Sequence, residues 1–176
     1  MNDQSPPDSP RPRSRKRRWL KRIGLGIVAL FVLIQAVPYG RSHTNPPATA
    51  SVAWDTPKTE QLFMTACADC HSNLTKWPWY TNVAPVSWLV QHDVDEGRGT
   101  MNISDANRGI EIEEVQEVLQ EGEMPPRQYT IKHSDAKLSD ADKAALIAGM
   151  RVTFADRLVA DGGDGDGDGD GDGDGD

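Results

Sequence analysis

The residues with the most distinctive chemistry are two cysteines and a histidine in one short stretch, Cys67-Ala68-Asp69-Cys70-His71. In this C-x-x-C-H pattern, two thiols three residues apart on a helical turn can each add to one vinyl group of the same porphyrin. The next residue, His71, then projects its imidazole toward the iron. The chain has only two cysteines, so no second pair competes for this chemistry. We therefore predict one covalently attached haem c, with His71 as an iron ligand.

Two other uses of these residues remain open. A thiol–disulfide pair of the thioredoxin type belongs in a βαβ setting, which the pattern of this sequence does not indicate. A structural zinc site needs four ligands, and the sequence offers no second cysteine pair to complete one. Both alternatives predict a chain without covalent haem.

Met124 is the best candidate for the sixth iron ligand. It lies in Glu121-Gly122-Glu123-Met124-Pro125-Pro126, beyond the end of a predicted helix and outside any periodic apolar stripe. Two prolines follow and stiffen the loop. A thioether opposite His71 would raise the reduction potential of a cytochrome c. The alternative is that Met124 fills a gap in the core, and His92 and His133 are weaker candidates for a ligand.

The densest aromatic cluster of the chain, Trp77-Pro78-Trp79-Tyr80, follows the C-x-x-C-H stretch. Large apolar rings suit packing against a porphyrin, and their N–H or O–H groups could reach its propionates. We predict Trp77, Trp79 and Tyr80 as haem-binding residues, with ordinary loop anchoring as the alternative. Further candidates for propionate contacts are Arg98, Arg127 and Tyr129.

Local signals predict four short helices that must position these residues. They are expected over about residues 55–66, 85–96, 104–121 and 139–158. Each begins at a capping residue or a proline, and Gly122 ends the third. Gly149 in the fourth could allow close approach of another helix. The residues that share one face of the fourth helix are Ile147, Met150, Phe154 and Leu158.

No segment between residues 55 and 160 alternates apolar and polar residues as a strand would, so we predict an all-α fold. Long loops over 69–84 and 122–138 leave a thin core for a domain of about 105 residues. A buried porphyrin would fill that core. The predicted fold is a small cytochrome c-like helical domain wrapped around a covalent haem, with one N-terminal transmembrane helix and disordered ends.

Composition divides the chain into five parts. Residues 1–18 are rich in proline, serine and basic residues, and residues 161–176 are an Asp-Gly repeat, so both ends are predicted to be disordered. Residues 19–40 contain an apolar run and are predicted to be a transmembrane anchor. Residues 41–54 are expected to be a tether, and residues 55–160 are expected to be the haem-binding domain.

The anchor prediction has one competitor. The apolar run from Ile23 to Val37 spans about 25 Å as a helix, slightly less than the ~30 Å hydrocarbon core, and Trp19 and Tyr39 could extend it into the interface. A cleaved signal peptide would have the same basic start, but the suitable cleavage site, Ala48-Thr49-Ala50, lies far beyond the run. We therefore expect a single-pass inner-membrane protein with a cytoplasmic N-terminus and a periplasmic haem domain.

The charge distribution excludes one class of function and indicates a kind of partner. The net charge is −8, and eight of the 19 basic residues lie in the first 22 positions. Such a chain is a poor general binder of nucleic acid, which requires clustered Lys and Arg. An acidic domain would favour a redox partner with a basic docking patch. The Asp-Gly tail could collect Ca²⁺, but plain alternation lacks the spacing of a calcium loop.

Several motifs occur in an order that resembles a known family. They are Cys67-Ala68-Asp69-Cys70-His71-Ser72-Asn73, Thr75, Trp77-Pro78-Trp79-Tyr80, Ala84-Pro85-Val86-Ser87-Trp88-Leu89, Asp93-Val94-Asp95-Glu96-Gly97-Arg98, Glu121-Gly122-Glu123-Met124-Pro125-Pro126 and Leu138-Ser139. Over about residues 52–155 the chain resembles the bacterial haem-binding domain family of c-type cytochromes. In that family an aromatic residue often follows the double proline, where this chain has Arg127. The resemblance implies a membrane-anchored or exported domain with one covalently bound haem.

Together these residues predict a membrane-anchored monohaem c-type cytochrome that carries single electrons and is not an enzyme. Its iron would change oxidation state while His71 and Met124 stay bound. A different class of function is a gas or peroxide sensor, or a peroxidase-like domain, with a labile sixth ligand. Carbon monoxide would separate the two, because its binding requires Met124 to leave the iron. A haem that serves only as a folding core is a further alternative.

Overall fold

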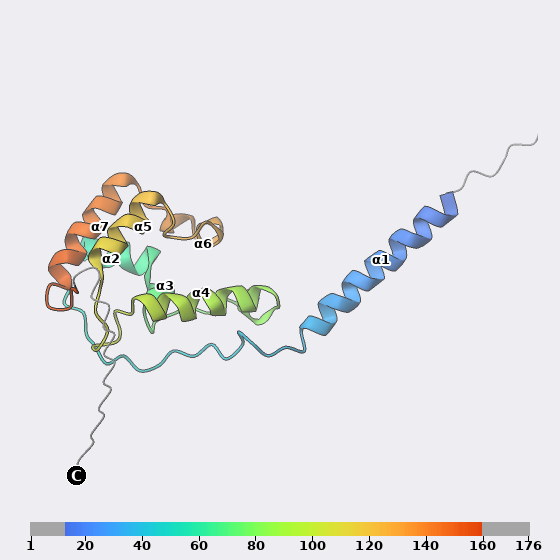
Figure 1. Cartoon of the computed structure of the whole chain (residues 1–176), viewed down its shortest axis with the longest axis horizontal. Helices are drawn as coiled ribbons and strands as arrows, with labels where there is room; N and C mark the ends of the chain where they lie inside the picture. Colours follow the sequence, from blue (N-terminus) through green and yellow to red (C-terminus); the bar gives the residue numbers. More distant parts are fainter. Residues whose placement is uncertain (1–12, 160–176) are drawn as a thin grey trace, which may run out of the picture. The chain divides into compact units, whose positions relative to one another are not determined.

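The computed structural model describes residues 13–159, which fold into helices joined by loops (Figure 1). The helices are α1 (Arg13–Ile34), α2 (Pro57–Ala66), α3 (Ala68–His71), α4 (Val86–Thr100), α5 (Ile112–Glu121), α6 (Arg127–Lys132) and α7 (Asp140–Thr153). Two 3₁₀ helices cover Trp79–Asn82 and Ser134–Ala136. Within residues 13–159, strand-like pairing is limited to one parallel bridge between Ile110 and Leu158. The predicted all-α class is therefore confirmed.

The chain folds as two units. The first consists of Met1–His43 and Trp77–Gln91, and the second of Thr44–Lys76 and His92–Asp176, so the division runs through α4. Helix α1 begins inside the N-terminal stretch that was expected to be disordered. Residues 1–12 of that stretch and the whole Asp-Gly tail lie outside the described residues.

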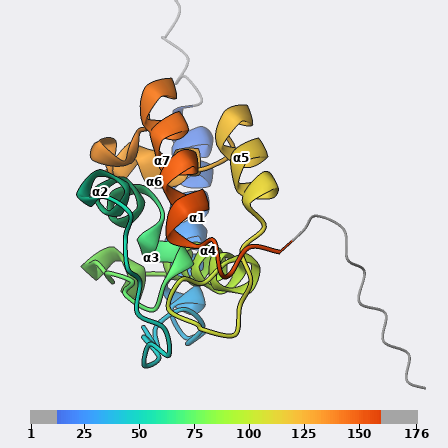
Figure 2. The ribbon, with the colours of Figure 1, turned by 90° about the vertical axis from the view of Figure 1, so that its left-hand side faces the viewer.

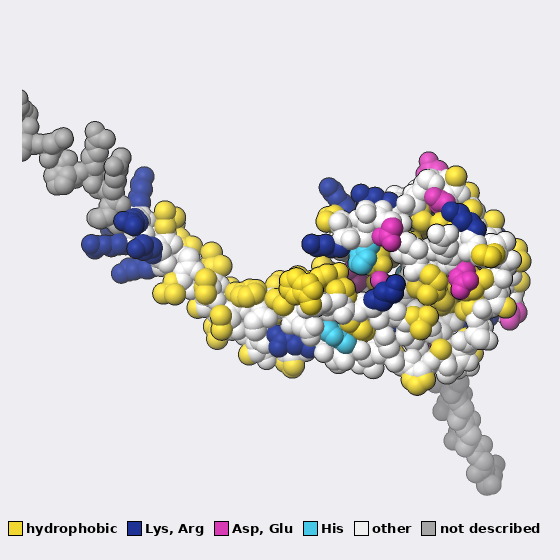
Figure 3. Space-filling model, turned by 180° about the vertical axis from the view of Figure 1, so that it is seen from behind, with side chains coloured by type: hydrophobic (Ala, Val, Ile, Leu, Met, Phe, Trp, Pro, Cys, Tyr) yellow, Lys and Arg dark blue, Asp and Glu magenta, His cyan; other side chains and the backbone are white. Residues whose placement is uncertain are grey.

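Helix α1 has a basic start and a short apolar end. It has 22 residues, and seven of its first ten are Lys or Arg, so dark blue side chains gather at its beginning (Figure 3). The apolar part within the helix, Ile23–Ile34, spans roughly 18 Å against a hydrocarbon core of ~30 Å. None of the helices described is both long enough and apolar enough to cross a membrane. The predicted transmembrane helix over 19–40 and the single-pass membrane location are therefore wrong.

The core of the second unit forms where α7 packs against both α2 and α5 (Figure 2). Ile147, Met150 and Phe154 are buried, which confirms the apolar face predicted for the fourth helix. The fourth member of that face, Leu158, lies beyond the end of α7 and is partly buried against the core. The remaining fully buried side chains of this core include Phe63, Ile112, Leu119 and Leu146.

Gly149 lies where α7 meets α2. A Cβ placed on this glycine would lie 2.0 Å from Oγ1 of Thr59, a buried residue of α2. This distance is far shorter than two atoms that are not bonded to each other can adopt, so the helices approach as closely as they do because residue 149 has no side chain. The close approach predicted at Gly149 is confirmed.

Capping residues set the starts of two helices. The Ser139 hydroxyl accepts a hydrogen bond from the Asp142 N–H at 3.1 Å and begins α7 as predicted. Helix α2 begins at Pro57, as expected from the Asp55-Thr56-Pro57 sequence, and its cap is Thr56, whose hydroxyl accepts from the Thr59 N–H at 3.2 Å. Both caps satisfy backbone donors that a helix start leaves without an internal partner.

Several helix boundaries differ from the prediction, among them the end of α7 at Thr153 instead of about residue 158, and α6 was not predicted. The third helix, expected from residue 104, begins only at Ile112 as α5, because residues 101–110 contact other parts of the chain. Helix α4 continues through Gly97 to Thr100, and α6 lies inside the loop expected over 122–138. Gly122 ends α5 as predicted, with a left-handed φ of 78° that suits glycine.

Residues 44–54, which were expected to be a tether, are hydrogen-bonded within the second unit. The Thr49 N–H donates to the Ser104 carbonyl at 2.8 Å, and the Asn45 side chain donates to the Thr75 carbonyl at 2.8 Å. Within the first unit, the side-chain amide of Gln35 bonds both the N–H and the C=O of Ala84, at 3.0 Å each. The chain after α1 is therefore attached to folded elements along its length.

Candidate functional site

Cys67, Cys70, His71 and Met124 line one cavity in the second unit, so the structure brings together the four residues that were predicted to hold haem. The cavity has a volume of about 470 Å³, within the ~300–1,000 Å³ typical of sites for small molecules and cofactors. Its wall comes from α2 and α3, from α4, from α5 and the loop that follows it, from Gln128 and Tyr129 of α6, and from α7. The apolar part of that wall includes Val115, Val118, Leu119, Leu146 and Met150.

The two cysteines lie at the ends of one helical turn, as the spacing requires. Cys67 follows α2 and precedes the short helix α3, and its carbonyl accepts from the Cys70 N–H at 3.1 Å. Both residues carry free thiols. Burial raises the pKa of Cys67 to about 12, with a contribution from Cys70. Burial also raises the pKa of Cys70 to about 12, aided by the carboxylates of Asp93 and Asp69.

His71 is held with one ring nitrogen engaged. Its Nδ1 lies 3.2 Å from the carbonyl oxygen of Met101, and since a carbonyl can only accept, Nδ1 carries the proton. Nε2 then keeps its lone pair, which is the form of imidazole that binds a metal. Burial lowers the pKa of His71, against the opposing effect of the Met101 carbonyl, so the ring is neutral near pH 7.

Gly97 allows α4 to cross directly over the C-x-x-C-H turn. A Cβ on this residue would lie 2.8 Å from the carbonyl oxygen of Cys70 and 2.9 Å from its Cβ. Two residues further along the same helix, a Cβ on Gly99 would meet nothing within 4 Å. The helix predicted over about residues 85–96 stopped just before Gly97, and the sequence carries no local signal for this contact.

The loop that carries Met124 is fixed at its first end by the last turn of α5. The Glu123 and Met124 N–H groups both donate to the Val118 carbonyl, at 3.0 and 3.1 Å. Met124 itself is 37 % exposed and lines the cavity. Because the backbone of the loop is anchored at this end, the side chain of Met124 extends from a fixed backbone position beside the cavity.

The other end of this loop is joined to the C-x-x-C-H turn. The Tyr129 hydroxyl on α6 donates to Oδ2 of Asp69 at 2.8 Å, and the ring of Tyr129 stacks on His133 with centroids 4.2 Å apart. Burial and the neighbouring Asp69 carboxylate hold the pKa of Tyr129 above its usual value. Asp69, inside the motif, thus connects the histidine side of the cavity to the methionine side. Neither residue was assigned this role from the sequence, because the partners are far apart in the chain.

The predicted aromatic residues lie elsewhere in the described chain. Trp77, Trp79 and Tyr80 belong to the first unit, and none of them is among the residues that line the cavity. Trp77 stacks on His43 with centroids 4.7 Å apart, whereas Trp79 is 78 % exposed and meets Tyr80 edge-on at 6.0 Å. Their role in haem binding stays a prediction.

The propionate candidates have other partners. The Arg98 guanidinium donates to the carbonyls of Ser72 and Thr44, at 3.0 and 2.9 Å, and to the side chains of Asn45 and Thr75. It therefore holds loops of the second unit together. Tyr129 is bonded to Asp69 as described above, and Arg127 is the first residue of α6.

All the ionised side chains on the cavity wall, as far as the structure describes it, are acidic. No Lys or Arg is among them. Burial raises the pKa of Asp93, so water does not fully solvate this carboxylate. The remaining five are Asp69, Glu96, Glu111, Glu114 and Glu123. The wall therefore presents negative charge around an apolar interior.

The donor set fits a porphyrin better than it fits a bare metal ion. Two thiols on one turn, a neutral imidazole with a free nitrogen and a thioether lie around a cavity of about 470 Å³ with an apolar interior. Over residues 13–159, no three His, Cys, Asp or Glu side chains are grouped so that they could hold a metal ion by themselves. The zinc alternative therefore gains no support.

Comparison with known proteins agrees with this chemistry. A family model described as a haem-binding domain matches residues 29–152, well over half of the chain and further toward the N-terminus than the resemblance in the sequence had indicated. Neither the comparison with curated proteins nor the comparison with solved structures found a match. The extent of the family match, together with a cavity lined by the residues of the C-x-x-C-H motif, means that this chain belongs to the haem-binding domain family.

Proposed function

We propose that the second unit holds one haem c, attached through thioether bonds to Cys67 and Cys70, and acts as a one-electron carrier rather than an enzyme. His71 and Met124 would hold its iron. The observation that carries this proposal is that both thiols, the imidazole and the thioether line a single cavity. When bound, the haem iron supplies a couple of two oxidation states that differ by one electron.

The residues around the cavity favour a fixed ligand pair. The Met101 carbonyl fixes the tautomer of His71 and orients its ring, so that Nε2 can bind without a proton having to leave. The Met124 thioether is a soft ligand, which favours the reduced state and raises the potential. The apolar side chains of α5 and α7 on the cavity wall would limit the access of water to both ligands.

The charge of the cavity wall indicates the kind of redox partner. Six carboxylates without a Lys or Arg among the described wall residues would attract a partner with a basic patch and speed its approach. Because such attraction is screened over roughly 8 Å at physiological ionic strength, electron transfer between the two proteins should slow as salt is added. A partner that binds through apolar contacts would show no such dependence.

A second function is favoured by one observation. Met124 is 37 % exposed and lies on a loop, so it is the ligand that could leave to make room for a gas or a peroxide. In that case the domain would be a sensor or a peroxidase-like enzyme, with Met124 as a labile sixth ligand. The two functions differ in one measurable property, the binding of carbon monoxide by the reduced protein.

The test uses the full chain, produced in a host with a haem c maturation system. We expect haem to remain on the polypeptide after denaturation, and we expect the double variant Cys67→Ala, Cys70→Ala to lose it. The spectrum of the folded protein should be low-spin and unchanged by carbon monoxide at a concentration that fully shifts the Met124→Ala variant. Met124→Ala should make it sensitive to carbon monoxide, whereas Met64→Ala, a methionine with the same 37 % exposure on α2, should not.

Three outcomes would change the conclusion. Haem that is covalently bound in a protein already sensitive to carbon monoxide would favour the sensor or peroxidase function. Equal effects of the Met64 and Met124 variants would remove Met124 as a ligand. A chain without covalent haem, in cells that mature a control cytochrome, would return the two cysteines to thiol chemistry.

A further inference from the structure

A short buried segment holds the ring and the backbone of His71. Met101–Ser104 follows α4, and all four of its residues are buried. The Met101 carbonyl accepts from Nδ1 of His71, and the Ile103 N–H donates to the His71 carbonyl at 3.0 Å. The orientation of the imidazole therefore depends on where this segment lies.

Two side chains of the same segment hold Asn73, which lies two residues after His71 in the chain. The Asn102 amide donates to Oδ1 of Asn73 at 2.9 Å, and the Ser104 hydroxyl accepts from the Asn73 N–H at 3.0 Å. These bonds are buried, so they have little competition from water. Met101–Ser104 and the chain from His71 to Asn73 thus form one hydrogen-bonded structure.

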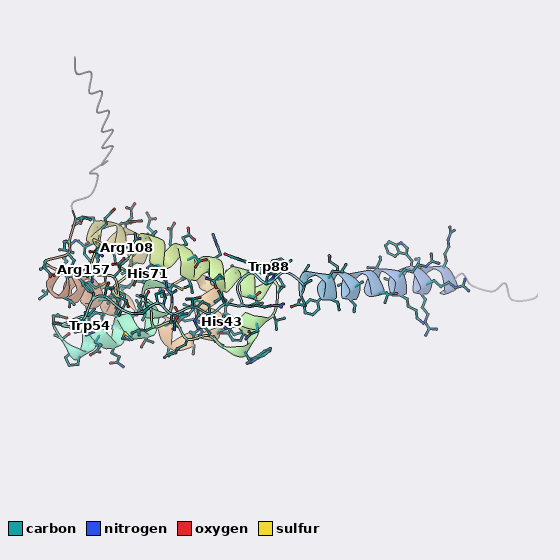
Figure 4. All side chains as sticks on the ribbon, turned by 90° about the horizontal axis from the view of Figure 1, so that it is seen from below. His43, Trp54, His71, Trp88, Arg108 and Arg157 are labelled. Atoms are coloured by element: carbon teal, nitrogen blue, oxygen red, sulfur yellow. The ribbon has the colours of Figure 1, made fainter. Side chains whose placement is uncertain are left out.

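Arg157 lies beyond the end of α7, and its side chain donates hydrogen bonds to carbonyl oxygens of this segment and of the loop after it. Its guanidinium donates to Ile103 at 3.1 Å, to Asn102 at 3.1 Å, to Asp105 at 2.6 Å and to Arg108 at 2.9 Å. Figure 4 labels Arg157 together with Arg108 and His71. A planar group with five N–H donors can serve four carbonyls at once, which the single ammonium of a lysine cannot do.

The backbone of Arg157 is fixed as well. Its carbonyl accepts from the Ile110 N–H at 2.9 Å, and the Val159 N–H donates to the Ile110 carbonyl at 3.2 Å. Its guanidinium also lies over the ring of Phe154, 5.5 Å from the centroid. The side chain therefore starts from a rigid position and contacts the segment that orients His71.

We propose that Arg157 is a positioning residue for the His71 ligand and acts through the Met101–Ser104 segment. This proposal rests on the function proposed above, in which His71 binds the iron. Removing the guanidinium leaves the four carbonyls without that donor and loosens the segment. The bond from Nδ1 of His71 to the Met101 carbonyl then weakens, which makes the imidazole a poorer donor to the iron and favours the reduced state.

The test compares Arg157→Gln with Arg151→Gln in the full, haem-loaded chain. Arg151 is a matched control, since it bonds Glu113 and Gln116 at 2.9 and 3.2 Å and does not contact the segment. We expect Arg157→Gln to raise the ratio of reduced to oxidised protein at a fixed ambient potential about threefold, less than the 10–100-fold typical of a direct partner of a metal ligand. NMR of the reduced protein should show the Nδ1 proton of His71 exchanging with water on the order of tenfold faster. Arg151→Gln should change neither quantity.

The measurements distinguish a failure of the Arg157 proposal from a failure of the proposed function. If the wild type carries haem with His71 bound and Arg157→Gln matches Arg151→Gln in both quantities, the Arg157 proposal is wrong and the proposed function stands. If the wild type has no haem bound through His71, the proposed function fails and the Arg157 proposal falls with it. Should Arg157→Gln not fold, Arg157→Lys decides by the same measurements, because it keeps the charge but can serve fewer carbonyls.

Discussion

Replacing Tyr129 with phenylalanine tests whether the bond between α6 and Asp69 helps to hold Met124 in the place proposed for it as an iron ligand. The substitution keeps the ring and its stacking on His133 and removes only the hydroxyl, which donates to Asp69 over 2.8 Å. The other carboxylate oxygen of Asp69 retains the Lys76 N–H at 3.1 Å. The change is therefore confined to one hydrogen bond.

The magnitude follows from the type and the burial of this bond. A hydrogen bond to a charged group contributes about 1.5–3 kcal/mol, and because both side chains are half-buried we take the lower end, about 1.5 kcal/mol. This corresponds to roughly tenfold in an equilibrium constant. If the bond restrains the Met124 loop, its loss shifts the balance between bound and unbound thioether by up to about tenfold.

The assay is a titration of the reduced, haem-loaded protein with carbon monoxide. The apparent affinity of Tyr129→Phe should rise by up to about tenfold, since carbon monoxide binds only when the thioether has left. Tyr39→Phe is the control, because it removes an exposed phenol hydroxyl in the first unit. In an Asp69→Asn background, Tyr129→Phe should add little, as expected when two residues act through one contact.

The reasoning is refuted if Tyr129→Phe and Tyr39→Phe have the same affinity for carbon monoxide within about twofold. It is also refuted if the two substitutions at the Asp69–Tyr129 pair add fully. In both cases the Met124 loop would be held by its bonds to the Val118 carbonyl alone.

Three further predictions concern the packing that positions the site. Gly97→Ala should lower the free energy of unfolding by about 1–3 kcal/mol and reduce haem loading, because its methyl group would clash with the C-x-x-C-H turn. Gly99→Ala in the same helix should be neutral or slightly stabilising, because its methyl group would meet no other atom. Gly149→Ala should cost at least as much in urea unfolding, since its methyl would meet the buried, stiff side chain of Thr59. Ser139→Ala should cost about 1 kcal/mol in the same assay through loss of the α7 cap, and an unchanged midpoint would contradict the capping role.

Local signals in the sequence were enough to select four residues that the structure places together. Cys67, Cys70 and His71 follow from the spacing of one motif, and Met124 follows from its position after a helix end and before two prolines. The structure places all four on one cavity wall. Helix caps and the apolar face of α7 were predicted for the same reason, because each depends on residues within a few positions of one another.

Contacts between distant parts of the chain could not be predicted in this way. Asp69 and Tyr129 are 60 positions apart, and nothing in the local pattern pairs them. Nor does any local pattern pair Arg157 with the carbonyls around residue 103. For the same reason the third helix was predicted to begin too early, because residues 104–110 are hydrogen-bonded to the C-terminal end of the described chain and are not part of α5. The transmembrane prediction failed because it treated the whole apolar run from Ile23 to Val37 as helical, whereas the helix ends at Ile34.

The two sides of the cavity are held with unequal firmness, and this ranks the proposed functions. The ring of His71 is held by a part-buried hydrogen bond to the Met101 carbonyl, and the Met101–Ser104 segment is in turn tied to Asn73 by two buried hydrogen bonds. Met124 depends on backbone bonds at the end of α5 and on the half-buried pair of Asp69 and Tyr129, where water can compete. If His71 and Met124 are the ligands as proposed, the thioether is therefore the one that leaves more readily. An electron carrier needs Met124 to stay in place, whereas a sensor needs it to leave, so the Asp69–Tyr129 bond, together with the bonds to the Val118 carbonyl, bears on which of the two proposed functions the domain performs.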